Sequence, residues 1–533
     1  MNWQESERAA SKDSRKMARP GPVRACPNAV RSFAIPAPRA VFFILASIPP
    51  VRIKRFFGNI SFVVLLNLLV KPGWVVVENL VQDRLGHATF GLLTALSALT
   101  LVVAALSDLG LTPYSVKRVA AEPTFMAETF PTLLPLRGVL NAVALAAMLG
   151  VGWALGYRGS ELLLLGAIGT ALLLAQYGQF LRGTLQAHQQ FNTDAVLSVV
   201  EKLLLLGAVL VLLPVGLTLP RYVGARLAAA AFSTAVLYGL MTRLFGRIKY
   251  RWKAPVARTA LRASLPFALM TLLYGVNERI DMVMLERLAS PTEAGYYAGA
   301  YRWVDAVMMY AWTVLPLFFA KFASVPGDAV AQRELLRFGQ RILTLPLLFV
   351  VAFVLFRGEV LFWQFSHSTP AEVARMTWCL KILFVNVLVH AFFAIYSTLL
   401  TSTTHERPVS WLVAGSTLLN IGLNLFLLPK YGAVAASLNT LLCAVGVSVG
   451  YLVLVARRTG VSVPFRLLGR LLLAFGLLCG TWYVLQYGLS KSLGWWLEAG
   501  IMGVVFVVIV LGTGLVRRSE IAQVLPGKGN AGT

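Results

Sequence analysis

The sequence is poor in charged residues, and acidic residues are the scarcest of them. Charged residues occupy 13% of the 533 positions and apolar residues occupy 57%. Average soluble domains have about 25% charged and roughly 45–50% apolar residues. Because this chain has about half the usual charge, most of it cannot face water. The composition excludes an ordinary soluble protein and predicts one embedded in a membrane.

The sequence also lacks the residue patterns of metal sites and of several enzyme classes. Its four cysteines form no CxxC motif, and its five histidines are scattered without ligand spacing. It contains no Walker A or HExxH sequence. No loop expected on the outer side of the membrane is long enough to house a glycan polymerase site. We therefore expect no metal, no cofactor and no enzymatic activity.

Basic residues outnumber acidic ones by 48 to 23, which gives a net charge of +25. They fall mainly in short segments between apolar runs, and no basic stripe with interleaved aromatics marks a soluble domain. This distribution is typical of the cytoplasmic loops of membrane proteins. We therefore do not expect the protein to bind nucleic acid.

Long apolar runs are abundant and predict an all-α, polytopic membrane protein. The runs are continuous, as at Leu203–Leu213, and lack the alternation of outer-membrane strands. Fourteen spans are expected, at 58–80, 90–109, 132–156, 161–182, 195–214, 222–244, 264–285, 295–320, 338–363, 374–401, 408–428, 432–456, 465–488 and 494–516.

Residues 1–56 are basic and rich in proline, and we expect them to form a disordered cytoplasmic tail. Their apolar stretch, Ala40–Ile48, is too short to span a membrane, and no signal-peptidase site follows it. A second hypothesis places the translation start at Val51, in which case most of the tail is not made. N-terminal sequencing that recovers earlier residues would exclude that start.

The loops alternate in basic charge, and this orients the helices. Lys117-Arg118 follow span 2, the segment 243–262 holds seven Lys or Arg and no acid, and Arg517-Arg518 follow span 14. Loops on the other side, such as Gly156–Ser160, are shorter and poorer in cations. We therefore expect a multi-pass protein of the cytoplasmic (inner) membrane with both termini in the cytoplasm.

An internal repeat divides the spans into two halves. Leu185–Pro214 and Leu400–Pro429 cover equal lengths (214 − 185 and 429 − 400) and end in Leu-Leu-Pro. Phe90-Gly91 and Ala294-Gly295 form a second, earlier echo. Six spans per half give the halves the same orientation. The expected parts are an N-lobe (57–244), a basic cytoplasmic linker (245–263), a C-lobe (264–456), two further spans (457–516) and a cytoplasmic tail (517–533).

Polar residues inside spans are costly and are therefore candidates for a functional site. Span 7 holds four within about two turns: Asn277, Glu278, Arg279 and Asp281. Asn277 and Asp281 share one helix face. Such a helix should line a cavity rather than face lipid. Structural ion pairs between helices are the alternative explanation.

Other spans add candidates for the same cavity. Span 8 carries Arg302 and Asp305, whose spacing allows an ion pair between them. The remaining candidates are Arg137, Gln179, Arg182, Arg226 and Lys381. For Arg137, Arg182 and Arg226, the commoner explanation is that a cation near a helix end reaches out to the membrane interface. An excess of arginine in the cavity would suit an anionic cargo group such as a phosphate.

Four short motifs follow one another along the chain. They are Arg84-Leu-Gly-His-Ala-Thr-Phe-Gly91, Ser107-Asp108-Leu-Gly-Leu111, Ile280-Asp281 followed by Ala294-Gly295-Tyr296-Tyr297-Ala298, and Asn424 to Ala436. Over about residues 57–516 the chain thereby resembles the oligosaccharide (O-antigen type) flippases of the multidrug/oligosaccharidyl-lipid/polysaccharide exporter (MOP) superfamily. Val434 and Ala435 depart from the family pattern, which often has glycine there.

The resemblance implies a MATE-like fold with two six-helix lobes around a central cavity, plus two extra helices. It implies alternating access and a cargo of oligosaccharide linked to polyprenyl pyrophosphate, moved for polysaccharide or O-antigen export. It also implies coupling to H+ or Na+, with Asp281 as the candidate acidic residue. Membrane lipids are the remaining expected partners.

Two other functions stay open. One is an ion-coupled multidrug or metabolite exporter of the same superfamily. The excess of cations in the cavity argues against the export of cationic drugs. The other is a membrane enzyme such as a glycan polymerase or ligase, which would need a long outer loop.

Overall fold

The computed structural model describes residues 73–121, 125–187, 191–246, 250–403, 406–459, 461, 464–486 and 494–516. All of them belong to one compact unit, Ser61–Thr533. The tails expected at 1–56 and 517–533, and most of the first span, lie outside the described residues.

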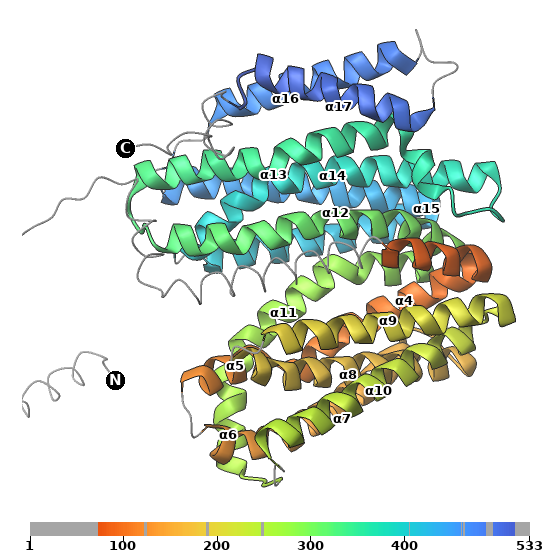
Figure 1. Ribbon diagram of the computed structural model, residues 1–533, viewed down its shortest axis with the longest axis vertical. Helices are drawn as coiled ribbons and strands as arrows, with labels where there is room; N and C mark the ends of the chain where they lie inside the picture. Colours follow the sequence, from red (N-terminus) through yellow and green to blue (C-terminus); the bar gives the residue numbers. More distant parts are fainter. Residues whose placement is uncertain are drawn as a thin grey trace, which may run out of the picture. The chain divides into compact units, whose positions relative to one another are not determined.

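The described residues are helical and contain no strand, which confirms the expected all-α class (Figure 1). Ten of these helices are long and apolar enough to cross a membrane. After a helical segment at 73–85 come α4 (His87–Asp108), α5 (Leu111–Ala121), α6 (Phe125–Glu128), α7 (Phe130–Ala154), α8 (Ser160–Ala187), α9 (Phe191–Gly216), α10 (Leu219–Phe245), α11 (Ala254–Leu288), α12 (Pro291–Ala323), α13 (Ala329–Arg357), η2 (Gly358–Phe362), α14 (Pro370–Ser402), α15 (Glu406–Arg458), α16 (Phe465–Val484) and α17 (Trp495–Gly512).

α15 consists of two antiparallel helices joined by a sharp turn, and it accounts for predicted spans 11 and 12. At the turn, Gly432 has φ 59° and ψ −135°, a conformation that favours glycine. Asn439 Nδ2 donates to Asn424 Oδ1 at 2.8 Å. In a straight helix these two residues would be separated by about 22 Å. The two halves of α15 therefore lie side by side.

Two segments expected to be loops are helical. Leu109 (φ 43°) and Gly110 (φ 74°) end α4, and α5 follows at once, packing against α8 and α11 with Leu111 buried. α11 begins at Ala254 instead of near 264, so the expected linker 245–263 is partly helix. Both segments are too polar overall to be recognised as spans. Each nevertheless has a short apolar face that packs on the N-lobe.

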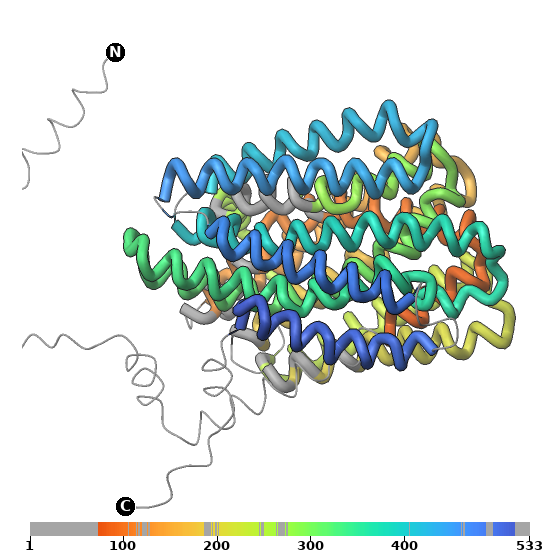
Figure 2. The backbone as a smooth tube through the Cα atoms, turned by 90° about the horizontal axis from the view of Figure 1, so that it is seen from above, coloured from red at the N-terminus to blue at the C-terminus, as the bar shows by residue number. Residues whose placement is uncertain are grey.

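The helices form two lobes and an added pair, as the sequence predicts. α8 packs on α7, α9 and α10, α9 packs on α10, and α4 packs on α7 and α8. α12, α13, α14 and α15 form the second group, with α11 packed against α15 and α12. Figures 1 and 2 show the long helices running side by side within each group. α16 and α17 pack on α13.

A buried ion pair and an aromatic cluster attach the last two helices to α13. Arg357 Nε and Nη2 donate to the two oxygens of Glu498 at 2.7 and 2.5 Å, and Glu498 is fully buried. Trp482 on α16 is also fully buried, and its ring stacks on Phe356 at 6.0 Å between centres. The pairing of two charges compensates for their burial away from water.

α4 and α12 cross in backbone contact close to the residues at which they begin. A Cβ atom added at Gly91 would overlap the Pro291 carbonyl oxygen, and one added at Gly295 would overlap the His87 carbonyl oxygen. Only glycine allows two helices to approach so closely. Gly91 and Gly295 are the glycines of the earlier echo in the expected internal repeat. The helices that carry this echo in the two predicted halves therefore contact each other at its glycines.

Candidate functional site

Two adjoining cavities lie where α4, α11 and their neighbours meet. The first, of about 150 Å³, we call the arginine pocket because its lining includes Arg226, Arg279 and Arg302, together with Glu78 and Asp305. The second, of about 370 Å³, we call the amide pocket. Its polar lining consists of Asp108, Thr112, Arg137, Gln176, Gln179, Glu278 and Arg279. Leu101 and Arg279 line both, so the two pockets are neighbours.

Arg279 links the two pockets and is held in place from α12. Its Nη2 atom lies 3.0 Å from Asp305 Oδ2, and its guanidinium carbon lies 5.3 Å from the centre of the Tyr301 ring. Asp305 therefore pairs with Arg279 on α11, not with Arg302 on its own helix. The partner of Asp305 lies on a neighbouring helix, so the spacing of residues along α12 could not predict it.

Arg302 extends from α12 toward the first span. Its Nη2 donates to Gln82 Oε1, its Nε donates to the Ala298 carbonyl at 3.3 Å, and its guanidinium lies 4.4 Å from the centre of the Phe90 ring. Its Nη1 atom is buried and has no hydrogen-bond partner among the described residues. A buried donor without a partner is costly.

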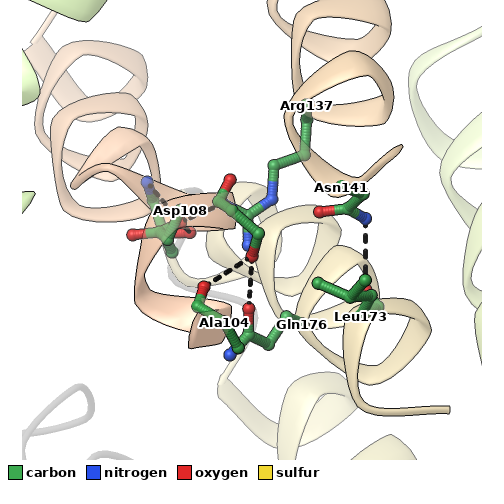
Figure 3. A network of polar contacts seen from close by, with 8 residues as sticks. Ala104, Asp108, Arg137, Asn141, Leu173 and Gln176 are labelled. Atoms are coloured by element: carbon green, nitrogen blue, oxygen red, sulfur yellow. Dashed lines mark hydrogen bonds and ion pairs between the residues drawn. The ribbon is translucent and has the colours of Figure 1, made fainter. Parts of the chain in front are cut away.

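The amide pocket is built on a network at the end of α4 (Figure 3). Arg137 is 1% exposed, and its Nη1 donates to Asp108 Oδ1 at 2.7 Å and to the Ser107 carbonyl at 2.5 Å. The single proton of Ser107 Oγ has two acceptors within reach, the Ala104 carbonyl at 2.8 Å and Gln176 Oε1 at 2.7 Å. Arg137 is therefore enclosed by protein and does not reach out to a membrane interface.

Asp281 lies apart from both pockets, inside the C-lobe. Its Oδ1 accepts a hydrogen bond from Asn424 Nδ2 at 2.7 Å, and its Oδ2 accepts from Thr440 Oγ1 at 2.9 Å and from Tyr297 Oη at 3.3 Å. Asn424 Nδ2 also donates to Asn420 Oδ1 at 3.0 Å. Among the ion pairs within the described segments, none includes Asp281. Its charge, when present, is balanced only by neutral donors.

The structure brings most of the predicted site residues together. The pocket linings include Arg137, Gln179, Arg226, Glu278, Arg279, Arg302 and Asp305. Asn277 accepts from Thr417 Oγ1 at 2.8 Å, and Lys381 Nζ lies 5.6 Å from the centre of the Trp378 ring. Like Asp281, the predicted cavity residues Asn277, Arg182 and Lys381 lie outside both linings.

Several residues of the site went unrecognised in the sequence. Glu78 satisfies the same criterion as the others, a charge inside an expected span, and could have been found by it. Gln82 lies beyond the expected end of that span at 80, although the helix continues to 85. Tyr301 and Thr440 carry no sequence signal because their positions depend on how the helices pack.

A third cavity, of about 580 Å³, lies where the first span and α12 meet the turn before α14. Here Asp83 Oδ2 lies 2.6 Å from His367 Nδ1, and the His367 backbone N–H donates to Asp83 Oδ1 at 3.0 Å. His87 Nε2 lies 2.9 Å from Ser368 Oγ, and Gln82 Nε2 donates to the Gly295 carbonyl at 2.8 Å. We call these contacts between the lobes the lobe latch.

The loop between α7 and α8 makes another contact between the lobes. Tyr157 Oη donates to Glu286 Oε2 at 2.7 Å, and the Arg287 guanidinium lies 3.4 Å from the centre of the Tyr157 ring. Burial and the hydrogen bond to Glu286 raise the pKa of the Tyr157 phenol. The phenol therefore remains protonated and continues to donate at physiological pH.

One pattern associated with hydrolases occurs in the chain, as Gly446-Val-Ser-Val-Gly450. The structure places it within the second of the two helices of α15, with Ser448 buried. A nucleophilic serine of this motif requires a strained turn between a strand and a helix. The pattern is therefore not a catalytic site.

Comparisons with known proteins agree with this architecture. A solved structure described as the lipid II flippase MurJ in an inward closed conformation matches 86% of this chain and 98% of its own, with a TM-score of 0.66 and 12% identity. An inward-facing multidrug resistance MATE family transporter of the MOP superfamily matches 74% of this chain and 94% of its own, with a TM-score of 0.54 and 17% identity. The chain has the fold of a MOP-superfamily membrane transporter.

Sequence comparisons point in the same direction. Residues 56–318 match the family model described as polysaccharide biosynthesis protein. An uncharacterised membrane protein of Methanocaldococcus jannaschii is 23% identical over 384 residues, which cover 68% of this chain and 89% of that protein. These matches agree with the resemblance seen in the sequence motifs, and the solved structures show the fold that the resemblance implies. The two structural relatives named above are a flippase and a transporter rather than enzymes.

Proposed function

We propose that the protein is a flippase that moves an oligosaccharide linked to polyprenyl pyrophosphate across the cytoplasmic membrane, for export of polysaccharide or O-antigen. The observation that carries this proposal is the pair of adjoining pockets, which gathers arginine, amide and carboxylate side chains inside a membrane-embedded bundle. Such groups are costly in a membrane unless they bind one another or a polar cargo. A lipid-linked glycan supplies this cargo, and its tail can stay in the bilayer.

The arginine pocket supports an anionic group on the cargo. Its three arginines outnumber its two carboxylates, and the planar guanidinium matches the oxygens of a phosphate. Arg302 belongs to the same lining, and its guanidinium is bound there to a neutral amide, Gln82, rather than to a carboxylate. A cationic drug would meet an excess of like charge in the same pocket. The pocket therefore favours a pyrophosphate over the cargo of a cationic-drug exporter.

Alternating access fits the contacts between the lobes. The positive-inside distribution places the ends of α4 and α12 that form the lobe latch on the outer side, and Asp108 on the cytoplasmic side. In this orientation, the Gly91–Gly295 crossing and the lobe latch close the outer end. Transport then requires these contacts to break while the cargo occupies the pockets.

Asp281 is the proposed coupling site for H+ or Na+. A buried carboxylate with no cationic partner is stable when it is protonated or binds a cation. The oxygens of Asn420 and Thr440 lie close to it and are hard ligands of the kind that an alkali cation prefers. Because Asp281 lies on α11, which also lines both pockets, its occupancy can affect the cavity.

The proposal is tested in cells that lack the chain and carry variants of it. Replacing Arg279 with Gln together with Asp305 with Asn removes the ion pair of the arginine pocket without leaving either charge unpaired. We expect surface glycan to disappear and lipid-linked glycan to accumulate while the variant stays in the membrane. Lys321→Gln, at the exposed end of the same α12, is the control.

Normal surface glycan in the double variant would contradict the proposed function. Normal glycan accompanied by a changed resistance to toxic compounds would favour the multidrug exporter instead.

A further inference from the structure

The two pockets differ in the chemistry that they offer to a ligand. The arginine pocket has an excess of cations, whereas the amide pocket has two carboxylates, two amides and two arginines. One of these arginines, Arg137, is already bound to Asp108 and to a backbone carbonyl. The other, Arg279, is bound to Asp305. The amide pocket therefore has no cation to spare for a second anionic group.

The groups left available in the amide pocket are neutral donors and acceptors together with a carboxylate. Gln176 uses its Oε1 to accept from Ser107, which leaves its Nε2 without a hydrogen-bond partner among the described residues. Gln179 is exposed toward the pocket, and no hydrogen bond of its amide is formed within the described part of the chain. Glu278 is likewise exposed and forms no ion pair there. Adjacent sugar hydroxyls both donate and accept, as these groups require.

A phosphate would bind poorly in the same place. It offers only acceptors and a negative charge, which Glu278 and Asp108 would repel. The lining therefore distinguishes between the two chemical parts of a glycosylated lipid pyrophosphate.

We infer that the amide pocket is the carbohydrate subsite of the cavity, in which Gln176, Gln179 and Glu278 bind hydroxyl groups of the sugar next to the pyrophosphate. This inference rests on the proposed function, because it takes the arginine pocket as the pyrophosphate subsite. These side chains determine which sugars the protein accepts.

The two subsites follow one another along α4. Residues from Phe90 to Leu101 line the arginine pocket and residues from Leu101 to Asp108 line the amide pocket, so the two subsites adjoin at Leu101. Arg279 lies at the junction of the two pockets. A cargo that fills both pockets therefore points its glycan toward Asp108 and its pyrophosphate toward the Gly91–Gly295 crossing.

The experiment measures binding to the purified full chain in nanodiscs. The two probes are undecaprenyl pyrophosphate and the same lipid carrying one N-acetylglucosamine. We expect the wild type to bind the glycosylated probe about tenfold more tightly, as two additional hydrogen bonds would give. In the Gln176→Leu, Gln179→Leu double variant, which keeps Glu278, we expect most of this preference to be lost. Ser107 keeps its bond to the Ala104 carbonyl in this variant.

Asn141→Leu is the matched control. It removes an amide that binds the Leu173 carbonyl between α7 and α8 but that lines neither pocket. We expect it to keep the tenfold preference. Binding of the unglycosylated probe shows in every variant that the protein is folded.

Two results would overturn the inference: a wild type with no preference for the glycosylated probe, or a glutamine double variant that keeps the preference. Neither result affects the proposed function, which fails separately if the Arg279→Gln, Asp305→Asn variant binds undecaprenyl pyrophosphate as well as the wild type does.

Discussion

The Gly91–Gly295 crossing makes a sharp prediction about how the outer end closes. A Cβ atom at position 295 would lie well inside the 3.0 Å that real Cβ atoms keep from the His87 carbonyl oxygen, so α4 and α12 must separate in Gly295→Ala. The obstructing atom belongs to the backbone and cannot rotate away. Overpacking of this kind costs about 1–3 kcal/mol. At the upper value, the ratio of closed to open molecules falls about 100-fold.

The opening is measured by the labelling of a cysteine placed at Thr94, which lines the arginine pocket, in a background without other cysteines. An impermeant maleimide added from outside should react much faster in Gly295→Ala and in Gly91→Ala than in the parent. Gly150→Ala on α7 is the control, because a Cβ there meets nothing within 4 Å. Unchanged labelling rates in both crossing variants would refute the assignment of the crossing as the outer closure.

Three further predictions concern other parts of the molecule. Asp281→Asn should remove the dependence of transport on a H+ or Na+ gradient in membrane vesicles, and retained dependence would exclude Asp281 as the coupling site. Arg357→Ala removes the guanidinium that pairs with buried Glu498 and should destabilise the protein by about 3–5 kcal/mol, seen as a lower unfolding temperature. Replacing both Arg357 and Glu498 by Ala should recover part of the lost stability. If it recovers none, the charge of Glu498 is not the cause of the destabilisation. A topology reporter inserted at 250–253 should report the cytoplasm, and an outer signal would overturn the predicted orientation.

The spans were predictable because length and apolar composition decide them. The turn at Gly432 illustrates this, since predicted spans 11 and 12 meet there and the structure turns the chain back at the same residue. α5 and the start of α11 were not predictable in the same way. These two segments are short or polar, so their own sequences do not predict a span. Their apolar residues pack on the N-lobe, and this packing stabilises them as helices.

The candidate site was predictable as a set of residues but not as a set of contacts. The cost of a charge in a membrane singled out Arg279, Arg302 and Asp305 without any structure. Which of them pair depends on neighbouring helices, and Arg302 turned out to contact Gln82 from the other half of the chain. The division into two pockets likewise depends on how α4, α8 and α11 meet. No spacing along the sequence encodes that arrangement.

Translocation in proteoliposomes tests the central claim most directly. The purified protein is reconstituted into vesicles with a fluorescent lipid-linked oligosaccharide in both leaflets, and an added glycosidase reports how much glycan the outer leaflet exposes. Without flipping, the enzyme digests only the outer half. We predict that the wild type makes nearly all of the glycan accessible and that the Arg279→Gln, Asp305→Asn variant leaves about half protected. Protection of half the glycan by the wild type, under an imposed H+ or Na+ gradient as well as without one, would contradict the proposed flippase function.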